Sequence, residues 1–291
     1  MTTGSLGDLS GRVCVVTGPT RGIGRATVDG LAALGATLVF VCRRREVGDE
    51  VAAEVVSKAP IRKPLVIEAD LSSLAAVRAA AAAIQAEHGE VHVLINNAGV
   101  VARERDTTVD GLETQLAVNH LAPFLLTRLL LPQLRAGAPS RVVTVSSTTH
   151  HGAVIDFDDL QSERSYDSAE VYAATKLMNV LFTYELARRL RGSGVTANCL
   201  HPGAVATRLL ADYMRIPVVG GALARTFGAT PEQGADTVIY LAASPEVASV
   251  TGRYYSNRRA TRSSPASYDE QLARRLWDAS ERLTGLSPLS T

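Results

Sequence analysis

Short apolar segments alternate with longer helical segments along almost the whole chain. The apolar segments are residues 13–17, 37–42, 65–68, 91–96, 141–146 and 196–200, and the helical ones are 22–34, 46–57, 73–87, 111–131 and 169–191. Strands that are apolar on both faces belong in a parallel sheet covered by helices on both sides. Because crossovers between parallel strands are right-handed, the alternation predicts an α/β fold with a doubly wound (Rossmann) sheet of about seven strands.

The composition limits the kinds of protein that the chain can be. Of its 291 residues, 46% are hydrophobic and 20% are charged, and the formal net charge is +1. A charge so close to zero gives no electrostatic reason to expect nucleic acid or an anionic membrane as a partner. Cys14, Cys42 and Cys199 are isolated and lack disulfide or zinc spacing, as is usual in the reducing cytosol. We therefore expect a soluble, cytoplasmic protein.

The chain shows no sign of division into parts. No linker rich in Pro, Gly or Ser interrupts it, and no internal repeat is visible. We predict one domain over residues 1–291, with a core from about 10 to 258 and a C-terminal helical extension from about 265 to 286. Residues 1–9 lack the basic and apolar regions of a signal peptide, and polar residues interrupt the apolar tract 116–132. We expect no membrane anchor.

A glycine-rich turn stands between the first predicted strand and the first predicted helix. Glycines at such a turn let the backbone bend tightly and let a pyrophosphate approach the free N–H groups at the helix N-terminus. Three residues separate Gly18 from Gly22, so the spacing departs from Gly-x-Gly-x-x-Gly. The strand before the turn and the helix after it still favour a nucleotide-binding loop over a plain turn. The candidate cofactor contacts here are Gly18, Thr20, Arg21, Gly22, Ile23 and Gly24.

The end of the second strand decides between the two nicotinamide dinucleotides, about 20 residues after the glycine turn. An acidic residue there would bond the ribose 2′-hydroxyl of NAD. The chain instead has Cys42, Arg43 and Arg44, with Arg21 inside the glycine turn. Guanidinium groups would neutralise a 2′-phosphate through charge-assisted hydrogen bonds. We therefore favour a role for these arginines in binding NADP(H) over the alternative that they are simply a solvated run of charges.

Tyr172 and Lys176 are four residues apart, downstream of Ser147. On a helix this spacing puts both side chains on one face, with their Cβ atoms about 5–6 Å apart. A free tyrosine has a pKa of about 10, and a nearby lysine cation lowers that pKa. The pair therefore predicts a proton donor, and with the glycine turn it indicates hydride transfer between a nicotinamide cofactor and a carbonyl or alcohol. Ser146 and Ser147 point to opposite faces of their strand, so only one can face a substrate.

Other polar clusters favour a plain structural interpretation. His150 and His151 are adjacent, but no cluster of carboxylates or cysteines accompanies them. The aspartates within 156–159 lack the glycine and the terminal glutamate of a calcium loop. We predict no metal site, a loop position for the histidine pair and a structural role for His201.

Five motifs follow one another along the chain, namely Thr17-Gly18-x-x-x-Gly22-Ile23-Gly24, Asn96-Asn97-Ala98-Gly99, Ser147, Tyr172-x-x-x-Lys176 and Pro202-Gly203. They have the order seen in the short-chain dehydrogenase/reductase family, which the chain resembles over about residues 10–285. The segments 118–121, 181–190 and 273–277, with the long interval from Ser147 to Tyr172, resemble the retinol dehydrogenase-like branch, which includes the WW-domain oxidoreductases.

The resemblance implies a role for each motif residue. Asp70 would bond the adenine, Leu71 would pack on its ring, and Asn119 would hold a proton-relay water by kinking its helix. Of the two adjacent serines, the family motif selects Ser147. The other residues that would contact the cofactor are Asn97, Ala98 and Gly99 around the adenosine ribose, and Pro202, Gly203, Val205 and Thr207 at the nicotinamide end, together with Tyr172 and Lys176.

The catalytic step that the resemblance implies is hydride transfer to the carbonyl carbon while Tyr172 protonates the oxygen. Lys176 would lower the tyrosine pKa and bond the nicotinamide ribose, and Ser147 would bond the carbonyl oxygen. Two alternatives stay open: an epimerase-like enzyme that uses bound nicotinamide for a net non-redox step, and a redox-silent dinucleotide-binding regulator. A regulator would be expected to lose the tyrosine or the lysine, and the chain keeps both.

The chain departs from the retinol dehydrogenase-like branch at two places. Ala122-Pro123 follows Leu121 where the branch more often has Gly-His, which could alter the helix below the active site. The N-terminal membrane anchor of many animal members is missing, which argues for a soluble enzyme.

The apolar segment 208–230 follows the sixth predicted strand, has few charges and contains Gly220-Gly221 as a hinge. Ligands in this fold bind at the carboxyl edge of the sheet, so the segment predicts an apolar wall and a lid. We therefore expect a bulky lipophilic small-molecule substrate of steroid, retinoid or polyketide type.

Helices 111–131 and 169–191 are apolar over much of their surface, more than one sheet face readily hides. The matching helices of the family pair across a two-fold axis. Together these points predict a homodimer or a homotetramer.

Overall fold

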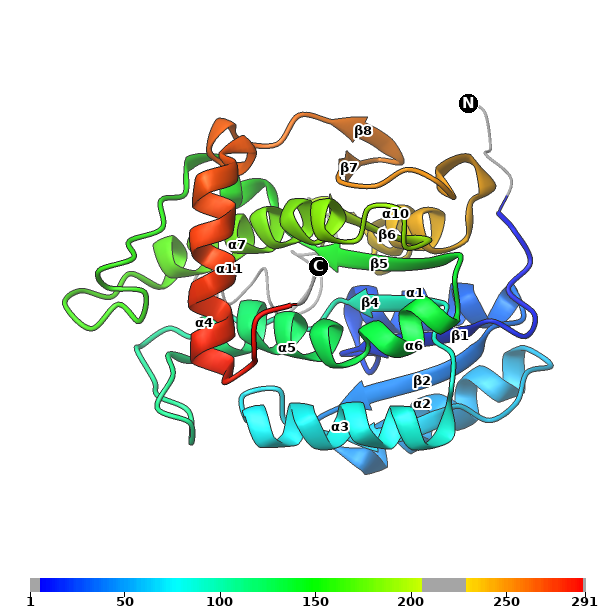
Figure 1. Cartoon of the computed structure of the whole chain (residues 1–291). Helices are drawn as coiled ribbons and strands as arrows, with labels where there is room; N and C mark the ends of the chain where they lie inside the picture. Colours follow the sequence, from blue (N-terminus) through cyan, green and yellow to red (C-terminus); the bar gives the residue numbers. More distant parts are fainter. Residues whose placement is uncertain (1–5, 206–228, 290–291) are drawn as a thin grey trace.

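The computed structural model describes residues 6–205 and 229–289, which form one sheet with helices on both faces (Figure 1). Its strands are β1 (Val13–Thr17), β2 (Thr37–Cys42), β3 (Leu65–Glu68), β4 (Val93–Asn96), β5 (Ser140–Val145), β6 (Val195–His201), β7 (Tyr254–Ser256) and β8 (Arg259–Thr261). The order across the sheet is β3-β2-β1-β4-β5-β6-β7-β8, and every neighbouring pair is parallel except β7 and β8. The doubly wound parallel sheet predicted from the sequence is confirmed.

The last two strands, β7 and β8, are not among the strands predicted from the sequence. Each has three residues, and all three of β8 are exposed, so neither has the apolar run that marks a buried strand. Asn257 and Arg258 join them with φ values of 49° and 59°, the positive values that a two-residue hairpin turn requires. The antiparallel β8 therefore forms one edge of an otherwise parallel sheet.

Helices cover the two faces of the sheet. They are α1 (Gly22–Ala33), α2 (Arg45–Lys58), α3 (Leu74–Glu87), α4 (Thr114–Leu116), α5 (Ala122–Leu129), α6 (Leu131–Ala136), α7 (Ser168–Arg189), α10 (Pro231–Ala243) and α11 (Glu270–Thr284). Alternate residues of one strand enter different cores, because strand side chains alternate between faces. Val16 and Phe40 pack under α1, α2 and α10, whereas Val15 and Val39 pack under α3, α5 and α7.

The helix predicted over 111–131 is divided in the structure. After α4 comes a π-helical turn over Ala117–Leu121, and then α5 and α6 follow as separate helices. Pro123 lies in the first turn of α5 and Pro132 in the first turn of α6. A proline is tolerated there because those N–H groups have no helical acceptor, and inside a continuous helix it would break a hydrogen bond.

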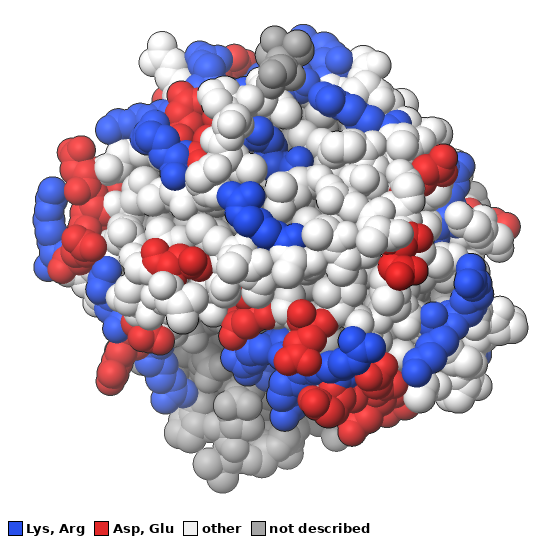
Figure 2. All heavy atoms as spheres, turned by 60° about the horizontal axis from the view of Figure 1, so that its bottom comes forward, with Lys and Arg blue, Asp and Glu red and all other residues white. Residues whose placement is uncertain are grey.

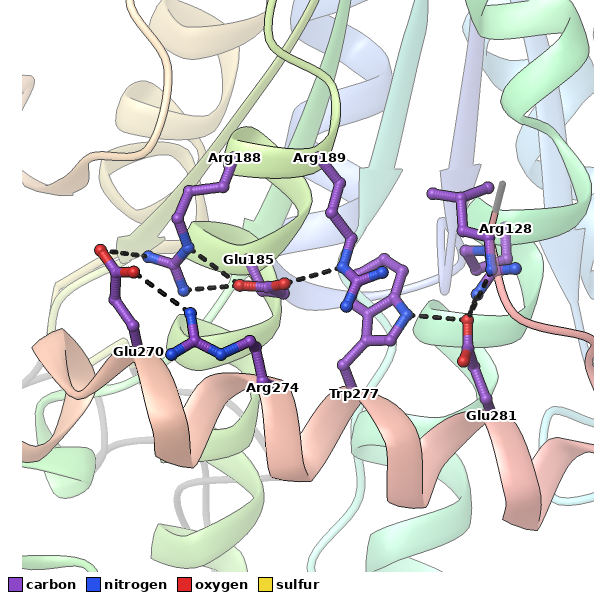
Figure 3. Close-up of polar contacts among 9 residues, drawn as sticks. Arg128, Glu185, Arg188, Arg189, Glu270, Arg274, Trp277 and Glu281 are labelled. Carbon is purple, nitrogen blue, oxygen red and sulfur yellow. Dashed lines mark hydrogen bonds and ion pairs between the residues drawn. The ribbon is translucent and has the colours of Figure 1, made fainter. Parts of the chain in front are cut away.

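The C-terminal helix α11 lies across α7 and α5 (Figures 1 and 3). The ring of Trp277 is buried and contacts two guanidinium groups, with the Cζ of Arg189 4.4 Å and the Cζ of Arg128 5.3 Å from its centre. Its indole N–H donates to Glu281 at 2.8 Å, and Glu281 also binds Arg128. Phe124 and Phe182 also pack on the indole, so aromatic and polar partners within the chain fix it together.

A second group of charges holds the same helices together near the start of α11 (Figure 3). Glu185 of α7 accepts from Arg188 at 2.9 Å and from Arg189 at 2.7 Å, and its carboxylate is almost fully buried. Glu270 of α11 pairs with Arg188 at 4.0 Å and with Arg274 at 3.3 Å. Buried charges need such partners, since an unpaired carboxylate inside a protein is costly.

This arrangement removes one reason for expecting an oligomer. The apolar surface of α5 and α7 that exceeds what the sheet can hide is covered by α11, where Leu276 and Trp277 join the cores of those helices. The homodimer or homotetramer stays a prediction that rests on the family resemblance.

Two surface properties complete the description of the fold. Among the helices of residues 6–205 and 229–289, none combines the length and the apolar character that crossing a membrane requires. Acidic and basic side chains are interspersed over the face drawn in Figure 2.

Candidate active site

The predicted site residues follow the carboxyl ends of six parallel strands, and these ends share one edge of the sheet (Figure 1). The glycine turn follows β1, the arginines follow β2, Asp70 follows β3, and the loop from Asn97 to Gly99 follows β4. Ser147 follows β5 and Pro202-Gly203 follows β6. A crevice at this edge is where doubly wound sheets bind their ligands.

The glycine turn has the geometry that a pyrophosphate needs. Gly18 and Gly22 have φ values of +66° and +55°, which favour glycine. A Cβ atom on Gly24 would lie 2.0 Å from the carbonyl oxygen of Gly18, so a larger residue would fill the turn. Arg21, the N-cap residue of α1, makes no side-chain cap, and the first N–H groups of the helix therefore stay available to an anion.

Thr17 joins the loops after β1 and β4, a role that no spacing in the sequence signals. Its hydroxyl donates to the carbonyl of Ile95 at 3.3 Å and accepts from the N–H groups of Asn97 and Ala98, both at 3.0 Å. The Asn97 amide in turn donates to the carbonyls of Thr17 at 2.9 Å and Gly18 at 3.1 Å. These bonds fix the two cofactor loops relative to each other.

A small apolar recess, with a volume of only about 10 Å³, lies between these loops and α5. It is lined by Thr17, Leu71, Asn96, Ala98, Val118, Ala122, Pro123 and Leu126. Leu71 and Ala98 are two of the residues that the resemblance assigns to the adenosine half of the cofactor. Beside Leu71, one oxygen of Asp70 accepts from the N–H of Ser72 at 3.0 Å and from its hydroxyl at 2.8 Å, which orients the carboxylate.

Three arginines lie in the loops after β1 and β2. Arg43 and Arg44 directly follow β2 and are exposed, as is Arg21. Within the part of the chain that the structure describes, no ion pair involves any of the three, whereas the next arginine, Arg45, pairs with Asp49 at 3.6 Å. Their charges are therefore not neutralised by the surrounding carboxylates.

Asn119 lies in the π turn and is fully buried. Its carbonyl oxygen accepts from the N–H of Val100 at 2.8 Å, and its amide donates to the Val100 carbonyl at 3.0 Å and to the Thr175 hydroxyl at 3.2 Å. The hydroxyl of Thr175 donates to the carbonyl of Tyr172 at 2.7 Å. Asn119 therefore connects the loop after β4 with the helix that carries Tyr172.

The departure at Ala122-Pro123 is accommodated by that π turn. Pro123 stands in the first turn of α5, directly after the turn, where it does not interrupt a regular helix. Both residues line the recess, so they form part of the wall of the site.

Ser147, Tyr172 and Lys176 lie where α7 crosses the end of β5. Ser146 donates to the carbonyl of Lys176 at 2.8 Å and so points toward α7, whereas Ser147 is the N-cap residue of the turn that follows. The Oγ of Ser147 accepts from the N–H of Thr149 at 3.3 Å, so its hydroxyl hydrogen can still be donated.

Lys176 is 3% exposed, and its Nζ atom donates to the carbonyl of Val145 at 3.3 Å. The same atom lies 5.4 Å from the centre of the Tyr172 ring. Burial lowers the pKa of Lys176 to about 8, so the lysine is still mostly cationic at neutral pH. A buried cation beside a phenol favours the ionised phenol, which is what a tyrosine needs to exchange a proton near pH 7.

The nicotinamide end is described only in part. Pro202 and Gly203 follow β6, Gly203 has a φ of +90°, and Val205 is buried and forms a bridge with Ala229. Thr207 and nearly all of the proposed lid 208–230 lie outside the described residues. Within the described residues, no three metal-ligating side chains converge. The contacts of His150 and His201 join residues that no sequence pattern connects.

The family model of the short chain dehydrogenases matches residues 12–215 of this chain. Retinol dehydrogenase 14 of Homo sapiens is 42% identical over 300 residues, which cover 97% of this chain and 89% of the relative. An uncharacterized protein from Mycobacterium Paratuberculosis has a crystal structure with a TM-score of 0.81 and 33% identity, and the match covers 99% of both chains. A structure with bound NADP at low occupancy, named as an NAD(P) dependent gluconate 5-dehydrogenase from Beutenbergia cavernae, matches with a TM-score of 0.69 and 30% identity over 86% of this chain and 96% of that one.

Proposed function

Because this chain belongs to the short-chain dehydrogenase family, in its retinol dehydrogenase-like part, we propose that it interconverts a carbonyl and an alcohol on a bulky lipophilic substrate with NADP(H). The observation that carries the proposal is the buried Lys176 cation 5.4 Å from the ring of Tyr172, beside Ser147 at the carboxyl edge of the sheet. That arrangement supports proton exchange at a substrate oxygen. A bound nicotinamide supplies or accepts the hydride.

Each of the three residues has a distinct task in the proposed reaction. Tyr172 gives a proton to the substrate oxygen during reduction and takes it back during oxidation. Ser147 donates a hydrogen bond to the same oxygen and so stabilises the charge that develops on it. Lys176 favours the ionised form of Tyr172 and holds the nicotinamide ribose through its remaining N–H donors. Asn119 holds the helix of Tyr172 against the loop after β4 through its hydrogen bonds to Val100 and Thr175. It would also hold the water that relays the proton.

NADP(H) is favoured over NAD(H) by three arginines, two directly after β2 and one in the glycine turn. Arg21, Arg43 and Arg44 are exposed and unpaired by carboxylates within the described residues. A 2′-phosphate would supply the missing negative charge, and guanidinium groups bind phosphate in a bidentate manner. The strand end carries Cys42, which cannot accept hydrogen bonds from the ribose of NAD as a carboxylate does.

The substrate class follows from the relatives and from the sequence of the proposed lid. Retinol dehydrogenases are named for a lipophilic alcohol, and 208–230 is apolar with few charges. An apolar wall over the nicotinamide would exclude water and would suit a steroid, retinoid or polyketide better than a sugar. Three free, buried cysteines are in keeping with the cytoplasmic location that we also propose.

The test is a panel of carbonyls and alcohols, each assayed with NADP(H) and with NAD(H). We expect net NADPH consumption with a steroid or aryl ketone and a higher kcat/KM for it than for a small 2-oxo acid. Product formation without net NADPH consumption would support the epimerase-like alternative. Tight NADPH binding with no turnover on any substrate would support the regulator, and preference for the small acid would overturn the lipophilic assignment.

A further inference from the structure

His150 is fully buried behind the loop that carries Ser147. Its Nε2 atom accepts the N–H of Ser264 at 3.1 Å, so that nitrogen carries no hydrogen. In a neutral imidazole the hydrogen must then lie on Nδ1, and Nδ1 is in direct contact with the carbonyl oxygen of Ser147. His150 therefore donates a hydrogen bond to the carbonyl of Ser147.

His201 meets the same peptide group from the other side. It is the last residue of β6, the neighbour of β5 in the sheet. Its Nδ1 atom accepts the N–H of Thr148 at 3.3 Å. The carbonyl of Ser147 and the N–H of Thr148 belong to one planar peptide unit, so two imidazoles hold the two polar atoms of that unit.

We propose that His150 and His201 are positioning residues that clamp the Ser147–Thr148 peptide and thereby hold the Ser147 hydroxyl in place for the substrate oxygen. This proposal rests on the function proposed above. A fixed peptide plane fixes ψ of Ser147, which sets the direction of its Cα–Cβ bond relative to the sheet. Neither histidine touches the reacting atoms in this assignment, and both act through Ser147.

The two histidines anchor the clamp in different parts of the fold. His150 reaches the segment after β8 through Ser264, and its ring centre lies 4.9 Å from that of Tyr254 in β7. His201 precedes Pro202-Gly203, which the resemblance places at the nicotinamide. Ser147 is thereby tied both to the strand that leads to the nicotinamide loop and to the hairpin at the sheet edge.

The surroundings keep both imidazoles neutral, as the two hydrogen-bond patterns require. Burial lowers the pKa of His150 to about 4, and burial also lowers the pKa of His201, with the nearby His151 adding to both shifts. A protonated His201 could not accept the N–H of Thr148, because both of its ring nitrogens would be donors.

The clamp can be tested at His201, which is only half-buried and tolerates substitution better than His150. His201→Leu removes the acceptor, whereas His201→Asn keeps an acceptor atom at the position of Nδ1. We expect His201→Leu to lower kcat by about 10- to 100-fold with KM for NADP(H) changed less than about twofold, and we expect His201→Asn to recover most of the loss. His88→Leu is the control, since His88 is the C-cap residue of α3 and makes no side-chain hydrogen bond within the described residues.

A double-mutant cycle with Ser147→Ala distinguishes an effect that acts through Ser147 from a general disturbance of the structure. If His201 acts only through Ser147, His201→Leu should lower kcat by less than about twofold once Ser147 is absent. Equal losses in the two backgrounds, or a wild-type kcat for His201→Leu, would overturn the clamp while leaving the proposed function intact. A wild-type kcat for Ser147→Ala itself would overturn the proposed role of that serine, and the clamp with it.

Discussion

The Nε2 atom of His120 lies 2.8 Å from the Oγ atom of Ser280, and this contact joins the π turn beside Asn119 to α11. His120 is 1% exposed, and burial lowers its pKa to about 4. The imidazole is therefore neutral at pH 7, as is that of His150, whose pKa burial lowers to a similar value. The core of this protein holds two histidines that resist protonation.

These two histidines predict a loss of stability in mild acid. Their folded-state pKa is below the unfolded value of about 6.5, so the unfolded chain binds more protons as the pH falls below that value. Between about pH 6.5 and pH 5, we expect the free energy of unfolding to fall by about 1.5 kcal/mol for each histidine. Urea unfolding of the wild type and of His120→Gln at both pH values measures this. The same loss in both proteins would contradict the assignment to His120.

Removing the indole of α11 should destabilise the fold strongly. Trp277 is 1% exposed and packs on Phe124 at 5.0 Å between ring centres, with two guanidinium groups close to its ring. We expect Trp277→Ala to cost about 3–5 kcal/mol, because it opens a large cavity and leaves Glu281 and two arginines partly unpaired. Arg274→Ala, on the exposed side of α11, is the control and should cost no more than about 1 kcal/mol. Equal effects in urea unfolding would show that α11 is held by its surface charges.

Loss of the Tyr172 hydroxyl should separate chemistry from binding. Tyr172→Phe keeps the ring over Lys176 and removes only the group that exchanges the proton. We expect turnover to fall by about 100-fold or more while NADP(H) binds as before, and we expect Lys176→Ala to weaken both. Steady-state kinetics with calorimetric titration of the cofactor tests the pair. Near-normal reduction by Tyr172→Phe would mean that another group supplies the proton.

The preference for NADP(H) should weaken when Arg43, at the end of β2, is replaced by an acidic residue. Arg43→Asp exchanges an unpaired guanidinium for a carboxylate, which repels a 2′-phosphate and can accept from the two hydroxyls of an NAD ribose. We expect the wild type to bind NADP(H) more tightly than NAD(H), and the variant to show a smaller or inverted preference. Arg45→Asp is a suitable control, since Arg45 already pairs with Asp49. A wild-type preference for NAD(H) in calorimetry would refute the assignment.

The charge of Lys176 should make cofactor affinity depend on pH. Burial lowers the pKa of this lysine to about 8, so it is cationic at pH 7 and loses its charge as the pH rises through about 8. We expect the affinity for NADP(H) to weaken between about pH 7 and pH 9, because the neutral amine donates weaker hydrogen bonds to the ribose. Lys176→Arg, which stays charged over this range, should show a flatter profile. An unchanged wild-type affinity across the range would show that the charge of Lys176 does not contribute to cofactor binding.

The sequence is sufficient to predict the parallel sheet and the placement of the site at its carboxyl edge. Buried strands such as β1 and β2 are continuous apolar runs, and the residues that follow them come to one edge through topology alone. The π turn at Asn119 and the break at Pro132 are harder to predict from the sequence, because the apolar pattern of 111–131 continues through both. The bonds of Thr17, His150 and His201 join residues that are distant in sequence, and no local pattern records them.

α11 is also the last helix of the fold to be synthesised. Trp277 leaves the ribosome about 90 residues after Arg189, which is roughly ten seconds of elongation at usual rates. During that interval the aromatic surface of Phe124 and Phe182 has no indole to pack against and is open to chaperones or to other nascent chains. Docking of α11 onto α5 and α7 can therefore be completed only after the rest of the sheet has been synthesised.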